Sequence, residues 1–109
     1  MDWVPIQYRE FYDVPRMFVA EYMGRTYLFD GSFDDTLDEY PSEYAVCVLP
    51  RQDSSQLSGS WENLRQQALF ECGKVRVSDV IFDVSRRAAV NSTVFDRVTV
   101  PSTPVNRAG

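Results

Sequence analysis

Residues 17–43 read MFVAEYMGRTYLFDGSFDDTLDEYPSE, and this stretch decides the fold. Its first half holds two runs rich in β-branched and aromatic residues, which are typical of strands and meet at Gly24-Arg25. Glycine in the first position of a two-residue connection fits a type II′ turn, because it takes positive φ at no steric cost. The stretch therefore predicts a β-hairpin in which Tyr22 pairs with Tyr27.

The second half of this stretch, residues 30–43, has the composition of a loop and contains no basic residue. We predict that a partner protein binds at its six acidic residues, a surface that would attract a basic partner: Asp30, Asp34, Asp35, Asp38, Glu39 and Glu43. The segment from Asp34 to Glu39 can form one helical turn, because the helix dipole favours aspartate near the start. Acidic runs also serve solubility alone, so a merely solvated loop is the competing interpretation.

Carboxylate oxygens are also the ligands that calcium and magnesium prefer. The spacing does not match an EF-hand loop, since no acidic residue follows Asp30 as far as Phe33. We therefore predict no bound metal and no cofactor. Strand pairing can still bring acids together, Asp30 with Glu10 or Asp79 with Asp83, and such pairs can act in acid–base catalysis.

Other parts of the chain also carry strand patterns. Residues 6–13 alternate imperfectly between apolar and polar side chains, as in a half-buried strand, and Pro15 then favours a bend. Residues 44–49 form a continuous apolar run between two prolines, which fits a central strand. Residues 74–83 read as one bent strand or two short ones, and residues 92–98 as a short helix or strand.

One amphipathic helix is predicted from Ser60, a suitable N-cap, to about Cys72. Apolar side chains recur at helical spacing on one face of it: Trp61, Leu64, Ala68 and Cys72. Gly73 follows as a residue that can end the helix in the left-handed conformation. We expect Trp61 to be the largest side chain that this helix packs on the sheet.

Together these elements predict a single α+β domain over residues 1–100, followed by a flexible C-terminal tail over residues 101–109. The domain is expected to hold about five strands in a twisted antiparallel sheet, which can curl toward a small barrel, with the amphipathic helix packed on one face. The other face of the sheet would then stay exposed and would carry aromatic side chains and arginines, a composition found at protein interfaces.

The composition disfavours several classes of function. The net charge is −5, so nucleic-acid binding, which depends on neutralising phosphates, is disfavoured. No apolar run reaches 18 residues and the first residues lack the pattern of a secretion signal, which predicts no membrane association and a cytoplasmic location. Histidine is absent, so Ser–His and Cys–His nucleophiles and the usual zinc sites cannot be built from this chain. Cys47 and Cys72 have no CxxC partner and are predicted to be buried free thiols.

The sequence thus predicts a small non-enzymatic protein that binds another protein through the acidic loop, the exposed aromatic sheet face, or both. An inhibitor or immunity role, in which an acidic surface covers a cationic site, is consistent with this prediction. Two alternatives remain open. One is a metal-assisted or carboxylate-dependent enzyme that uses the same loop, and the other is a structural homo-oligomer.

Overall fold

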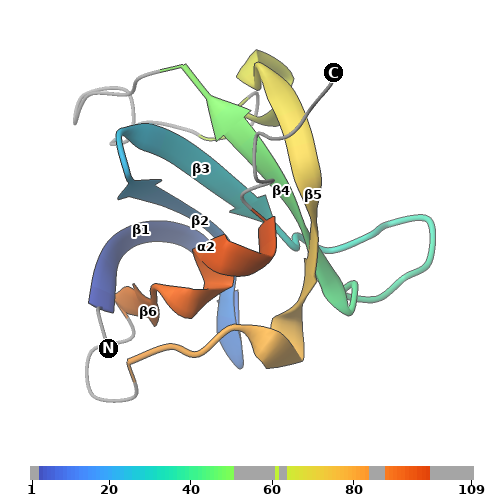
Figure 1. Cartoon of the computed structure of the whole chain (residues 1–109). Helices are drawn as coiled ribbons and strands as arrows, with labels where there is room; N and C mark the ends of the chain where they lie inside the picture. Colours follow the sequence, from blue (N-terminus) through green and yellow to red (C-terminus); the bar gives the residue numbers. More distant parts are fainter. Residues whose placement is uncertain (1–2, 51–60, 62–63, 84–87, 99–109) are drawn as a thin grey trace.

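A computed structural model of the chain describes residues 3–50, 61, 64–83 and 88–98. Within them, six strands form one antiparallel sheet in the order β5-β4-β3-β2-β1-β6 (Figure 1). The strands are β1 (Trp3–Tyr12), β2 (Val14–Tyr22), β3 (Arg25–Asp30), β4 (Glu43–Leu49), β5 (Phe70–Arg76) and β6 (Ala89–Asn91). The helices are the 3-10 turns η1 (Arg65–Gln67) and η2 (Val77–Asp79) and the α-helix α2 (Thr93–Val98).

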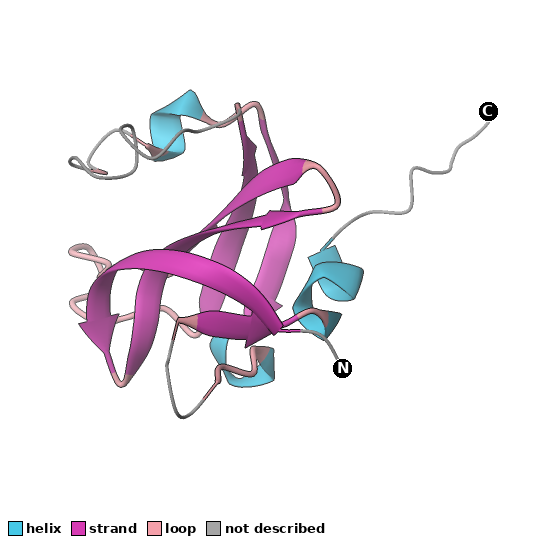
Figure 2. Ribbon diagram, turned by 90° about the vertical axis from the view of Figure 1, so that its left-hand side faces the viewer, coloured by secondary structure: helices cyan, strands magenta, loops and turns pink. Residues whose placement is uncertain are grey.

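This arrangement confirms the predicted α+β class with a twisted antiparallel sheet, and the described residues include one short α-helix, α2. The sheet has six strands rather than about five and does not close, because β5 and β6 stand at its two ends. Figure 2 shows how strongly the strands bend and twist. No helix among the described residues is long and apolar enough to cross a membrane. The tail predicted for residues 101–109 lies outside the described residues.

The predicted hairpin is present as β2 and β3, but its turn differs from the prediction. Tyr22 pairs with Arg25, and Ala20 pairs with Tyr27, so the turn residues are Met23 and Gly24. Their φ angles are 53° and 79°. Positive φ at both central positions is the signature of a type I′ turn, whose twist, like that of the predicted type II′ turn, matches the flanking strands. The predicted Tyr22–Tyr27 pairing is therefore wrong.

Packing against α2 explains the altered register. The rings of Tyr22 and Tyr27 both contact Phe95 of this helix, at centroid distances of 4.4 and 5.3 Å. On the same face Phe18 lies opposite Phe29, and the two rings stack at 4.5 Å. Aromatic contacts across strands and with the helix thus favour the observed pairing.

Two of the predicted strands are confirmed. The strand expected over residues 6–13 corresponds to β1, which starts earlier and ends at Tyr12, and the strand expected over residues 44–49 is β4. The bend expected near Pro15 occurs at Asp13, whose φ is 66°, and the chain returns there as β2. Pro15 itself lies inside β2, opposite Phe11.

The amphipathic helix predicted to run to Cys72 is wrong where the structure describes it. Residues 65–67 form only the turn η1, and the chain then enters β5, which pairs with β4. Gly73 lies within this strand at φ 155°, beside an irregularity in the register, instead of ending a helix. Pairing with β4 supplies the backbone hydrogen bonds, and tertiary pairing of this kind overrides a weak helix propensity.

The chain after β5 also departs from a simple strand. β5 ends at Arg76, and the turn η2 occupies the place of the bulge predicted at residues 78–79. Residues 81–83 then run beside β6, where the Asn91 amide donates to the Ile81 carbonyl at 2.8 Å. Of the two readings of residues 92–98, the helix is the one observed, as α2.

Side chains pack on both faces of the central strands. The larger cluster lies between the sheet and α2, and its fully buried members include Phe18, Phe29, Tyr44, Val46, Val90 and Phe95. The smaller cluster lies on the other face and joins Val19, Leu28, Cys47 and Leu49 to Trp61 and Leu64. The predicted burial of Trp61 against the sheet is confirmed, since Trp61 is only 4% exposed and packs in this cluster. The aromatic residues of β1 that stay exposed are Trp3 at the start of the strand and Tyr8, Phe11 and Tyr12 toward its end.

Candidate functional site

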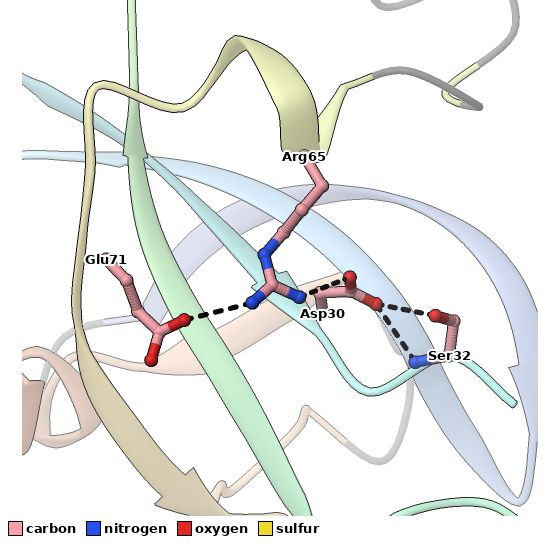
Figure 3. A network of polar contacts seen from close by, with 4 residues as sticks. All are labelled: Asp30, Ser32, Arg65 and Glu71. Atoms are coloured by element: carbon pink, nitrogen blue, oxygen red, sulfur yellow. Dashed lines mark hydrogen bonds and ion pairs between the residues drawn. The ribbon is translucent and has the colours of Figure 1, made fainter. Parts of the chain in front are cut away.

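The acidic loop, residues 30–43, connects β3 to β4 and begins at a fixed carboxylate. Asp30 accepts hydrogen bonds from the amide and hydroxyl of Ser32 at 3.1 and 2.7 Å, and its other oxygen pairs with Arg65 at 2.9 Å (Figure 3). The second nitrogen of Arg65 reaches Glu71 of β5, also at 2.9 Å. The Asp30 side chain is only 11% exposed. Its carboxylate therefore anchors the loop, and Asp30 also lines the hollow described below.

A buried tyrosine fixes the same end of the loop. The hydroxyl of Tyr44 donates to the carbonyl of Pro15 at 2.6 Å, and its ring is fully buried. Gly31 packs directly against this ring, since a Cβ atom at position 31 would lie 2.9 Å from Tyr44 Cδ1. Burial raises the pKa of Tyr44 well above its ordinary value, with the nearby Arg16 acting in the opposite direction.

The tip of the loop is a closed turn rather than the predicted helical turn. The Asp34 amide donates to the Glu39 carbonyl at 2.8 Å, and the Glu39 amide donates back at 3.3 Å. The Asp34 carboxylate accepts from the amides of Thr36 and Leu37 at 2.9 and 3.2 Å. Asp38 has φ 55°, which a helix does not allow. An aspartate that bonds its own following amides favours such turns over helix.

The structure places the six predicted site residues in two roles. Asp30 belongs to the anchoring network, whereas the other five carboxylates form no ion pair within the described part of the chain: Asp34, Asp35, Asp38, Glu39 and Glu43. Asp34 is half-buried, and the other four residues are exposed. Asp34, Asp35, Glu39 and Glu43 line an open hollow of about 610 Å³, whose wall also includes Arg65 and Lys74.

The positions of the acidic side chains and their partners limit the chemistry that these residues can perform. Across residues 3–50, 61, 64–83 and 88–98, no three His, Cys, Asp or Glu side chains converge as they would around a metal ion. Both carboxylate pairs considered from the sequence contain residues that have other partners. Asp30 binds Arg65, Glu10 accepts from the Phe33 amide at 3.1 Å, and Asp79 lies 3.9 Å from Arg97. Contacts of this kind are typical of acidic residues that have a structural role.

Sequence reasoning missed an aromatic group that borders the loop, which we call the aromatic flank: Tyr12, Phe33 and Tyr40. Tyr40 stacks on Tyr12 at 5.0 Å and meets the edge of Phe33 at 5.2 Å. The guanidinium carbon of Arg16 lies 4.7 Å from the Tyr40 ring centre. No sequence pattern indicates this group, because its members come from the β1–β2 hairpin and from two separate positions in the loop.

Further contacts tie the aromatic flank to the sheet. Arg16 donates to the carbonyls of Tyr12 and Pro41 at 3.1 and 3.5 Å, so it bridges the hairpin and the loop. Desolvation, together with the Glu10 carboxylate that is bonded to its hydroxyl, raises the pKa of Tyr40. Tyr12 and Phe33 nevertheless remain 56% and 40% exposed as residues. The flank thus combines ordered backbone with open ring surface.

Two other features lie away from this loop. Cys47 and Cys72 are free; the first is buried, the second half-buried, and burial raises the pKa of both thiols. A second hollow, of about 770 Å³, lies at the opposite end of β3 and includes the exposed side chains of Met23, Leu69 and Phe70. Neither feature contributes a carboxylate to the loop surface.

Comparison with known proteins gives no assignment. No protein-family model, curated protein or solved structure matches this chain. The function has to be inferred from the surface of the molecule.

Proposed function

We propose that this protein binds another protein through the acidic loop and that the bound surface of the partner is basic. The observation that carries the proposal is the set of five carboxylates that form no ion pair within the described residues. Four of them, those of Asp34, Asp35, Glu39 and Glu43, line one hollow. Clustered charge of one sign speeds the encounter with a surface of the opposite sign and suppresses wrong partners. No catalytic step is part of this proposal.

Order in the loop supports binding over mere solvation. The loop is tied to the sheet through Asp30, through the Glu10–Phe33 hydrogen bond and through Arg16. Its tip is closed by the two hydrogen bonds between Asp34 and Glu39. A segment that is already ordered loses less conformational entropy when it binds, so more of its interaction energy appears as affinity.

A pair of matched double variants tests the proposal. Asp35→Lys with Glu39→Lys reverses two exposed charges of the loop, and Glu21→Lys with Asp96→Lys makes the same change in charge elsewhere. The full-length chain and both variants are used as bait in extracts of the source cells, and captured proteins are identified by mass spectrometry. We expect a partner that the wild type and the control retain and that the loop variant loses.

Kinetics with the captured partner then examine the electrostatic part of the proposal. We expect the association rate to fall steeply as salt rises and the loop variant to lose most of this salt dependence, because charge steering acts on the association rate. Equal capture by the loop variant and the control would refute the proposal.

A further inference from the structure

The acidic loop and the aromatic flank form one continuous surface. Phe33 belongs to both, since it contacts Tyr40 and also lines the hollow beside Asp34 and Asp35. Tyr12 extends the ring surface onto the β1–β2 hairpin through its stacking on Tyr40. A partner that reaches the free carboxylates therefore also meets exposed aromatic rings.

The chain's own arginines show how a guanidinium binds aromatic rings and carboxylates in this structure. Arg16 places its guanidinium over Tyr40 at 4.7 Å, and Arg9 does the same over Trp61 at 4.8 Å. Arg65 binds two carboxylates at once, each at 2.9 Å (Figure 3). A planar guanidinium can stack on a ring and donate several parallel hydrogen bonds, whereas a lysine ammonium is a compact and strongly hydrated charge.

We infer that the partner presents arginine side chains, which stack on the exposed rings of Tyr12 and Phe33 and donate to the neighbouring loop carboxylates. This inference rests on the proposed function and specifies the chemistry of the partner. The internal ring Tyr40 already contacts Arg16 and both outer rings, so it supports the surface without contacting the partner. The flank makes the site selective for arginine over lysine, which carboxylates alone do not.

The inference is tested on the purified full-length chain with two synthetic probes, octa-arginine and octa-lysine, by calorimetric titration at low salt. Octa-arginine is expected to bind more tightly. Tyr12→Ala and Phe33→Ala should each weaken its binding about two- to fivefold, the range of one exposed cation–π contact, and should leave octa-lysine nearly unchanged. Met23→Ala removes an exposed side chain at the other end of β3 and should change neither affinity.

The outcomes separate the inference from the proposed function. Equal affinity for the two peptides, with ring variants that bind like wild type, would overturn arginine selectivity. The proposed function would survive that result if Asp35→Lys with Glu39→Lys still weakened both peptides. Failure of both peptides to bind would overturn the inference and count against a basic partner. Thermal melting checks the fold of each variant, and Phe33→Leu replaces Phe33→Ala if the smaller side chain lowers the melting temperature.

Discussion

At the scale of single residues, the base of the acidic loop depends on Tyr44. Its hydroxyl bonds the Pro15 carbonyl inside the core, and its ring closes on Gly31. A side chain at position 31 would overlap the ring, so glycine is required there for space and not for an unusual φ. Sequence reasoning placed Tyr44 in a central strand but could not show this contact, because the three residues belong to separate segments of the chain.

The raised pKa of Tyr44 predicts a loss of stability at high pH. An unfolded tyrosine ionises near pH 10, whereas the buried one stays protonated, so the folded state holds more protons above that pH and stability falls as pH rises. Tyr44→Phe lacks this ionisation. We expect wild type to exceed Tyr44→Phe by about 0.5–1.5 kcal/mol in free energy of unfolding at pH 7, the usual contribution of one hydrogen bond.

The difference in free energy of unfolding between wild type and Tyr44→Phe should be smaller at pH 11 than at pH 7. Urea titrations of both proteins at these two pH values measure it. The remaining tyrosines and both cysteines are common to the two proteins, so their ionisation largely cancels in the comparison. A difference that stays constant from pH 7 to pH 11 would contradict the assignment of Tyr44 as a buried, protonated hydroxyl.

At the scale of secondary-structure elements, the β2–β3 turn is a site of local strain. Met23 occupies the first central position of a type I′ turn with φ 53° and is 84% exposed. Asparagine is strongly preferred there, because it tolerates the left-handed conformation that disfavours most other side chains. Met23→Asn should therefore stabilise the protein by about 0.5–1 kcal/mol.

The melting temperature of Met23→Asn, compared with that of Met23→Ala, measures this effect. Both variants remove the same exposed side chain, but only asparagine relieves the strain, so asparagine should melt higher than alanine. An asparagine variant that melts at or below the alanine variant would show that the turn does not have the type I′ geometry.

The sequence and the structure agree on some elements for clear physical reasons. The strands β1, β2, β3 and β4 were predictable, because β-branched and aromatic runs are bounded there by glycine, proline or acidic turns. The segment after Leu64 was not, since its apolar residues satisfy helical spacing while the backbone pairs with β4. One local signal did point to α2. The Asn91 side chain accepts from the Thr93 amide at 2.9 Å, and asparagine before a helix is a common start signal.

At the scale of the whole molecule, the candidate surface combines predictable and unpredictable parts. The charge of the loop is evident from composition, and five of its six acids remain free of ion pairs in the described structure. The anchoring of Asp30 and the aromatic flank are not evident from the sequence, because Arg65 contacts Asp30, and Tyr12 contacts Tyr40, only in the folded chain. The sheet face that was expected to stay exposed is covered at its centre by Trp61 and Leu64.

Arg65 connects distant parts of the molecule, because it joins the end of β3 to β5. Its side chain is 43% exposed, so Arg65→Ala should lower the free energy of unfolding by no more than about 1 kcal/mol. The larger expected effect is local. Without this anchor the loop amides of Ser32 and Thr36 should exchange hydrogen faster, while the amides of β2 and β3 keep wild-type rates.

Hydrogen exchange followed by mass spectrometry compares Arg65→Ala with Arg97→Ala, which removes only a long and exposed ion pair to Asp79 at 3.9 Å. The control should leave the loop unchanged. Equal exchange in the loop of all three proteins would mean that Arg65 does not hold the loop in place.

The closed tip of the loop also bears on how such a protein can evolve. The hydrogen bonds between Asp34 and Glu39 join backbone atoms, so they do not depend on the side chains at positions 35–37. Substitutions there change the outer chemistry of the loop and leave the base at Gly31 and Tyr44 untouched. A lineage carrying this fold can therefore acquire new recognition at the tip through a few point mutations, without passing through unstable intermediates.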